Sequence, residues 1–174
     1  DTHPLICESS NGNNLAGLEV FADPVFRHKL ANSHKPSEIN PNHYDCIYFA
    51  GGHGVVYDFL DNKELHHIAR TIYEKGGIVS SVCHGAVALI NLKLSDGKNI
   101  VAGRKVTGFS NDEENKLNLI NMFIFNLTEL KARGAEYCRA PNWQEYCVAD
   151  GRLITGQNPS SGAAVGKAVL AFKW

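Results

Sequence analysis

The sequence lacks several features that would point to particular classes of protein. No apolar run approaches the roughly 20 residues of a membrane-spanning helix, and no signal-peptide pattern, repeat or low-complexity tract is found. Neither sign of charge dominates, because 17 lysines and arginines stand against 18 aspartates and glutamates. This balance argues against a nucleic acid or an anionic membrane as partner. We therefore expect a single domain over residues 1–174.

The cysteines show none of the spacings of a zinc finger or a C-x-x-C redox motif. There are five, which is an odd number. Four of them lie in apolar or strand-like runs, where a free cysteine behaves as a small hydrophobe: Cys7, Cys46, Cys138 and Cys147. A reducing, cytoplasmic setting fits this pattern better than a disulfide framework does. The fifth cysteine, Cys83, stands in a different context.

Cys83 follows a β-branched run and precedes a segment that favours a helix. Residues 78–82 predict a buried strand, and a helix is expected from the turn to about residue 92. A cysteine at such a turn is exposed, and its pKa is lowered because unpaired backbone N–H groups and the helix dipole favour the thiolate. Nucleophilic serines occupy the same kind of turn in some hydrolases. We interpret Cys83 as a nucleophile; the alternative is a buried small hydrophobe.

Strands and helices alternate in a way that predicts a parallel α/β sheet. Residues 44–50 predict a buried strand that stops at Gly-Gly-His-Gly, residues 51–54, and an amphipathic helix is expected over 62–75 after an asparagine N-cap. This order implies right-handed crossovers, with ligands at the carboxyl ends of the strands. We therefore expect the 51–54 turn, Cys83 and His84 to face one pocket.

The remaining segments predict short strands, a hairpin and further helices. Strands are expected at residues 5–7, 100–101, 105–107, 137–139, 146–148 and 152–155. Helices are expected from a serine cap at 110 through about 124, over 127–133 and from about 159 onward. Asp150-Gly151 predicts a two-residue hairpin. The segment before residue 41 is weakly periodic, with Phe26, Leu30 and Ile39 as its expected inward residues.

Four sequence blocks, in this order, resemble the ThiJ/PfpI superfamily. They are Tyr-Asp to Gly-Gly-His-Gly at 44–54, Val-Cys-His-Gly at 82–85, Val-Thr-Gly-Phe with trailing acids at 106–114, and Asp-Gly-Arg-Leu-Ile-Thr-Gly-Gln-Asn-Pro at 150–159. The superfamily includes the parkinsonism-associated deglycase, and these blocks resemble its heat-shock chaperone-like branch of glutathione-independent glyoxalases (glyoxalase III, D-lactate dehydratase). The resemblance implies a flavodoxin-like, class I glutamine amidotransferase-like three-layer sandwich with a mostly parallel sheet, a homodimer, and no metal or organic cofactor.

The resemblance also implies the members of a catalytic triad. Cys83 aligns with the family nucleophile and His84 with its histidine partner. The triad acid aligns with Glu114, although Asp112 and Glu113 are neighbouring alternatives. The alternative for Glu114 is an acid that merely stabilises the first turn of a helix.

Further positions are expected around the substrate. By resemblance, Gly52 supplies a backbone oxyanion donor and the backbone N–H of His84 the other. His53 either lines the pocket or caps a glycine turn, and Trp143 is either a pocket wall or part of a core or interface. The family's first strand and helix, with a glutamate that hydrogen-bonds the cysteine, are expected to be missing, since residues 5–7 resemble its second strand. Either the chain is truncated at its N-terminus, or other residues, another chain or a partner would fill that place.

The implied activity is that of a lyase that converts methylglyoxal or a similar 2-oxoaldehyde to a 2-hydroxy acid. Cys83 would form a hemithioacetal with the substrate, and His84 would move the proton. Two alternatives stay open: a protein deglycase or cysteine hydrolase on the same fold, and a stress-response holdase chaperone or redox sensor in which Cys83 is oxidised. Adjacent His66 and His67 cannot share a helix face, so no metal site is expected there.

Overall fold

Residues 15–117 and 126–172 are described by the computed structural model. The chain divides into two units, residues 1–39 and 40–174, and each is described by itself. The first unit contains α1 (Leu15–Ala22), α2 (Pro24–Ala31) and a 3₁₀ turn, η1 (Pro36–Glu38). The single domain over the whole chain stays a prediction, and the strand predicted at 5–7 lies outside the described residues.

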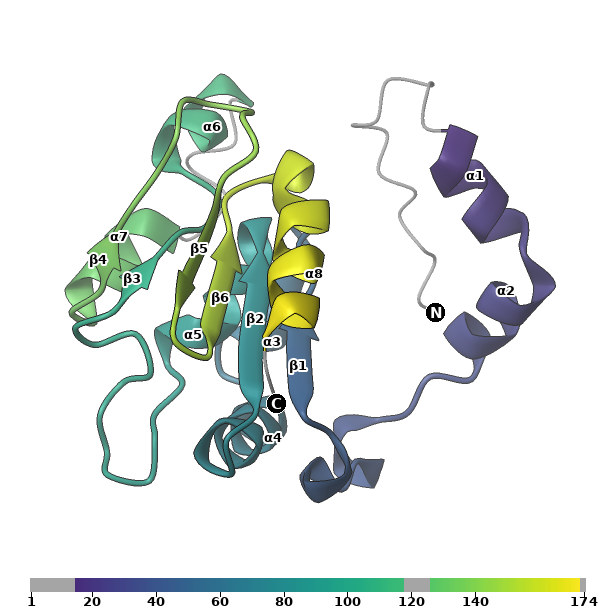
Figure 1. The fold of residues 1–174 in the computed structure, drawn as a ribbon, viewed down its shortest axis with the longest axis horizontal. Coiled ribbons are helices and arrows are strands. Elements are labelled where there is room, and N and C mark those ends of the chain that lie inside the picture. Colours follow the sequence, from purple (N-terminus) through teal and green to yellow (C-terminus); the bar gives the residue numbers. More distant parts are fainter. Residues whose placement is uncertain (1–14, 118–125, 173–174) are drawn as a thin grey trace. The chain divides into compact units, whose positions relative to one another are not determined.

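The second unit is built on a four-stranded sheet with the order β1-β2-β6-β5 (Figure 1). Its strands are β1 (Cys46–Phe49), β2 (Ile78–Val82), β5 (Cys147–Asp150) and β6 (Leu153–Gly156). The first three in that order run parallel, whereas β5 runs antiparallel to β6. A second, two-stranded parallel sheet pairs β3 (Lys105–Val106) with β4 (Glu136–Tyr137). The predicted mostly parallel α/β sheet is confirmed.

The helices and 3₁₀ turns of this unit connect the strands. They are η2 (Pro41–His43), α3 (Val55–Phe59), α4 (Lys63–Glu74), η3 (Cys83–Ala86), α5 (Val87–Ile90), α6 (Asn111–Lys116), α7 (Asn126–Ala132), η4 (Pro159–Ser161) and α8 (Gly162–Ala171). Residues 118–125, where the helix predicted from residue 110 would continue, lie outside the described residues. None of the described helices has the length and apolar character needed to cross a membrane.

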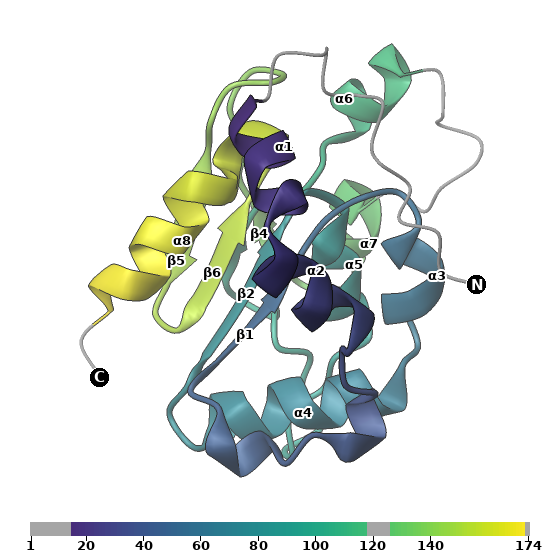
Figure 2. The same cartoon turned by 90° about the vertical axis from the view of Figure 1, so that its right-hand side faces the viewer.

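The larger sheet lies between two layers of helices, which gives the expected three-layer sandwich (Figures 1 and 2). On one face, Ile78 of β2 and Ile154 of β6 pack against Val165 of α8. On the other face, the adjacent residues Val79 and Leu153 belong to the larger core that includes α4 and α5. Neighbouring strand residues therefore point to opposite helix layers, as the pleat of a strand requires.

Local signals explain where the predicted elements begin and end. Asn62 caps α4 by accepting a hydrogen bond from the backbone N–H of Leu65 at 3.1 Å, as predicted. Gly76, with φ +103°, follows the end of this helix. The hairpin between β5 and β6 is also confirmed, but its two connecting residues are Gly151 and Arg152 rather than Asp150 and Gly151.

The strand predicted at 100–101 is wrong. Ile100 and Val101 lie in a turn, where the side-chain oxygen of Asn99 accepts from the N–H of Val101 at 3.0 Å and the carbonyl of Asn99 accepts from Ala102 at 3.0 Å. Both apolar side chains are fully buried in the core. Their apolar character therefore reflects burial rather than pairing in a sheet.

Candidate active site

Cys83 lies on a sharp turn where β2 ends. All five residues of β2 are buried, and the strand passes directly into the 3₁₀ turn η3 at Cys83. Cys83 has φ +58°, and among the described non-glycine residues only Trp143 shares a positive φ. This left-handed conformation costs an ordinary residue about 1–3 kcal/mol, so the surrounding contacts must hold it in place.

Two glycines allow the ends of β1 and β2 to approach each other at this turn. A Cβ on Gly85 would lie 2.1 Å from the carbonyl oxygen of Phe49, which ends β1. A Cβ on Gly51 would lie 2.7 Å from Cβ and 3.3 Å from Sγ of Cys83. The Gly-Gly-His-Gly turn is therefore in contact with the cysteine, as the sequence predicted for the two strand ends.

Burial has the largest effect on the Cys83 thiol and raises its pKa to about 12. Hydrogen bonds from the backbone N–H groups of His84 and Gly52 lower this pKa in part, while the carboxylates of Glu113 and Glu114 raise it. The predicted lowering of the pKa at the helix start is wrong, because desolvation of a residue that is only 6% exposed outweighs the backbone dipoles. The raised pKa favours the protonated thiol over the thiolate at neutral pH.

His84 joins Cys83 to a buried carboxylate. Its Nδ1 lies 3.4 Å from Sγ of Cys83, and its Nε2 lies 2.8 Å from Oε2 of Glu114. Burial, followed by the charge of His53, lowers the pKa of His84, and Glu114 raises it less, so the ring is neutral at neutral pH. The hydrogen bond to Glu114 assigns the proton to Nε2, which leaves Nδ1 as the acceptor that faces the thiol.

The three consecutive acids of α6 have different partners. Glu114 is 5% exposed and reaches His84, as the resemblance implied. Glu113 is fully buried and accepts hydrogen bonds from Ser110, which closes a capping box at the start of the helix. Asp112 is exposed and forms an ion pair with Arg139. Geometry therefore favours Glu114 over its two neighbours as the partner of His84.

His53 is the second histidine in contact with Glu114. Its Nε2 lies 3.1 Å from Oε1, its ring centroid lies 4.1 Å from that of His84, and its side chain is 31% exposed. The donor atoms of His53, His84 and Glu114 lie within 4.8 Å of one another, a set that suits a divalent ion such as zinc. Each carboxylate oxygen already pairs with one histidine, so hydrogen bonding alone also accounts for the cluster.

Aromatic side chains continue the site beyond the histidines. The Phe109 ring centroid lies 4.4 Å from that of His84, and Phe109 is buried together with Val82 and Cys83. The Trp143 ring lies 5.7 Å from Phe109 and is the exposed end of this row. The sequence predicted no role for Phe109, although this residue ends the Val-Thr-Gly-Phe motif. Its neighbours come from distant segments, which no local pattern reveals.

Comparisons with known proteins identify the family to which this chain is similar. The model of the DJ-1/PfpI family matches residues 8–171. Glyoxalase 3 of Candida albicans is 35% identical over 180 residues, which cover 98% of this chain and 75% of that protein. A probable glutathione-independent glyoxalase of Schizosaccharomyces pombe, hsp3103, is 38% identical over 85% of this chain and 60% of its own length. The chain thus spans about 60 to 75% of the length of these relatives.

A solved structure is similar as well. The crystal structure of glyoxalase III from Candida albicans superposes with a TM-score of 0.85 at 33% identity. The superposition covers 90% of this chain and 69% of that one. The three-layer architecture described above is thus also the architecture of this relative.

Proposed function

Because the chain belongs to the DJ-1/PfpI family, we propose that it is a glutathione-independent glyoxalase that converts methylglyoxal or a similar 2-oxoaldehyde to a 2-hydroxy acid. The family predicted from the four sequence blocks is confirmed, and curated relatives are named glutathione-independent glyoxalases. One observation carries the proposal: the Sγ of Cys83, the imidazole of His84 and the carboxylate of Glu114 form a continuous hydrogen-bonded relay.

In the first step, Sγ of Cys83 adds to the aldehyde carbon while its proton passes to Nδ1 of His84. The new C–S bond converts the carbonyl oxygen to an oxyanion, which then takes the proton from the imidazolium and gives a hemithioacetal. The backbone N–H groups of Gly52 and His84 stabilise the oxyanion. This role is supported by the hydrogen bonds that these two N–H groups donate to Sγ of Cys83. Glu114 stabilises the imidazolium, as the carboxylate does in serine triads.

In the second step, His84 moves a proton between the two substrate carbons. It removes the proton from the carbon bonded to sulfur, which forms an enediolate, and returns this proton to the neighbouring carbon, while the hydroxyl proton moves from the oxygen on the first carbon to the oxygen on the second. The product is a thioester of the 2-hydroxy acid, and water cleaves it to release the acid and restore the Cys83 thiol. One carbon is oxidised and its neighbour reduced within the same molecule, so the sum of the steps is the addition of one water.

The test is lactate formation from methylglyoxal in the absence of glutathione. We expect Cys83→Ser to lower turnover by at least about 1000-fold, because it removes the attacking sulfur. The matched control is Cys138→Ser, whose sulfur contacts the carbonyl of Glu136 and not the site. Full turnover by the Cys83 variant would contradict the mechanism.

The alternative functions are separated by the state of the thiol. A redox sensor needs an accessible thiolate, and the burial of Cys83 argues against that role. A deglycase or other cysteine hydrolase would use the same relay. An assay with glycated peptides or esters as substrates would distinguish it from a glyoxalase. The proposal also includes a cytoplasmic setting, supported by the free cysteines among the described residues. It includes a homodimer as well, which follows from the family resemblance and is tested by light scattering.

A further inference from the structure

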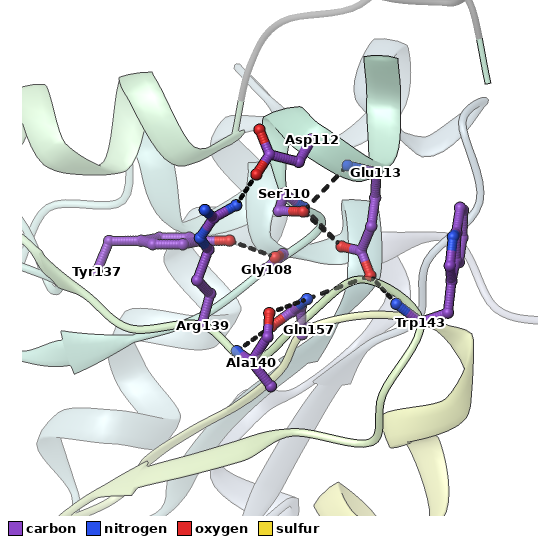
Figure 3. Close-up of polar contacts among 9 residues, drawn as sticks. All are labelled: Gly108, Ser110, Asp112, Glu113, Tyr137, Arg139, Ala140, Trp143 and Gln157. Carbon is purple, nitrogen blue, oxygen red and sulfur yellow. Dashed lines mark hydrogen bonds and ion pairs between the residues drawn. The ribbon is translucent and has the colours of Figure 1, made fainter. Parts of the chain in front are cut away.

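Glu113 is a fully buried carboxylate whose recorded hydrogen bonds come from neutral donors (Figure 3). Its Oε2 accepts from the backbone N–H and the hydroxyl of Ser110 at 3.0 and 2.8 Å. Its Oε1 accepts from the backbone N–H of Trp143 at 2.8 Å and from the side-chain amides of Gln157 and Asn158 at 3.2 and 2.9 Å. A buried charge requires such full satisfaction.

These bonds tie three separate segments of the chain to one side chain. Ser110 begins α6, Trp143 lies in the loop before β5, and Gln157 follows β6. The contact to Ser110 is the local capping box, so α6 does not need the contacts to the other two segments. A glutamate that served only as a cap would not have to reach Trp143.

The contact to Trp143 holds a residue in an unfavourable conformation. Trp143 has φ +66°, and a bulky residue keeps such a conformation only where its surroundings impose it. The imposed backbone directs the indole ring to the edge of Phe109, with centroids 5.7 Å apart and planes at 60°. Phe109 in turn packs on His84 and beside Cys83.

We propose that Glu113 is a positioning residue that holds Trp143 over Phe109, and that these two rings contact the carbon substituent of the 2-oxoaldehyde. The inference rests on the proposed function and extends it to the substrate class. The row of rings next to Cys83 favours 2-oxoaldehydes with an apolar or aromatic substituent, because an aryl group stacks on aromatic faces.

The first variant is Glu113→Asp, which keeps the charge and the capping box but shortens the side chain by one methylene, so that Trp143 loses its acceptor. The matched control is Glu145→Asp, the same change at an exposed position in the loop that carries Trp143. Both are measured with Trp174→Phe, because the sequence has two tryptophans and this change leaves Trp143 as the only fluorophore of its kind. The measurements are acrylamide quenching of Trp143 and steady-state kinetics with methylglyoxal and phenylglyoxal.

For Glu113→Asp we expect stronger quenching, a KM for phenylglyoxal raised about fivefold, and a kcat changed by less than about twofold. The KM for methylglyoxal should rise less. Quenching and both KM values equal to those of Glu145→Asp would overturn the proposal. An equal rise in KM for both substrates would also overturn the proposal, because a merely structural defect gives that result.

A second pair of variants decides the matter if Glu113→Asp does not fold. Trp143→Gly keeps the N–H that Glu113 accepts and suits the positive φ, but it removes the ring. It should raise the KM for phenylglyoxal about fivefold, and Trp143→Phe should restore most of the preference. An unchanged preference in Trp143→Gly would overturn the proposal. If the protein turns over no 2-oxoaldehyde, the proposed function fails, while the quenching result still decides whether Glu113 positions Trp143.

Discussion

The proposed nucleophile, Cys83, is a buried thiol beside a neutral imidazole. Burial raises the pKa of Cys83 to about 12 and lowers the pKa of His84, so the neutral pair is favoured over the thiolate–imidazolium pair in the unliganded site. In the proposed mechanism, the thiol therefore loses its proton only as the sulfur attacks the substrate, when the backbone N–H of Gly52 can stabilise the new oxyanion. The separation of 3.4 Å between Sγ and Nδ1 allows the proton to move directly.

The first prediction is the dependence of activity on pH. The neutral form of His84 is the base; it is present above its lowered pKa and is lost as the pH falls through that value. We expect kcat/KM to fall on the acid side with a midpoint below the ordinary histidine value of about 6.5, and to show no second rise near the ordinary thiol value of about 8.5. A pH profile with methylglyoxal measures both. A rise near 8.5 would mean that free thiolate is the nucleophile.

The second prediction concerns His53, which shares Glu114 with His84. The charge of His53 lowers the pKa of His84, and its hydrogen bond occupies one oxygen of Glu114. His53→Gln removes the charge, so the pKa of His84 should rise and the acid side of the profile should move to higher pH, with kcat lowered less than about tenfold. Movement to lower pH would show that His53 acts on His84 in the opposite direction.

At the scale of the elements, the site depends on how closely the ends of β1 and β2 approach. The missing side chain of Gly85 is what allows this approach, because a Cβ there would overlap backbone atoms of Phe49 and Ala50 at 2.1 to 2.9 Å. The backbone of a strand that is paired in a sheet cannot move aside as a flexible side chain does. The strand end and the cysteine turn would have to separate.

The third prediction follows from this overlap. Gly85→Ala should lower the free energy of unfolding by about 3 kcal/mol, since the overlap is with backbone in a packed core. Gly166→Ala is the control: a Cβ meets nothing within 4 Å in α8, and stability should stay level or rise by about 1 kcal/mol. Denaturant unfolding monitored by circular dichroism measures both. Equal stabilities would show that the turn can open at no cost.

Elements with strong local signals were predictable, and those that depend on distant contacts were not. Asn62 and Ser110 are the N-cap residues of α4 and α6, and both helices begin where the sequence indicates. Ile100 and Val101 form a turn although their sequence predicts a strand, because core burial and strand formation favour the same residue types. Glu113 and Trp143 are 30 residues apart in the sequence, so the spacing of apolar and polar residues within one element could not predict their contact.

At the scale of the whole molecule, the two units differ in how much of their secondary structure is buried. In α2 no residue is buried, and Phe26 and Leu30, which were predicted to point inward, are 38% and 49% exposed. The segment was hard to assign from sequence because its apolar residues are only weakly periodic. By contrast, every residue of β2 and β6 is buried. The second unit therefore contains the cooperative core.

The fourth prediction is that hydrogen exchange separates the units. A helix of eight residues without buried side chains is shorter than the roughly 12–15 residues that an isolated helix needs to be even marginally stable. We expect amides of α2 to exchange about a thousandfold faster, or more, than those of β2 and β6, whose opening requires global unfolding. Mass spectrometry at two protein concentrations measures this. Protection of α2 equal to that of β2 at both concentrations would show that α2 packs stably within one chain, whereas protection that grows with concentration would assign its packing to the proposed homodimer.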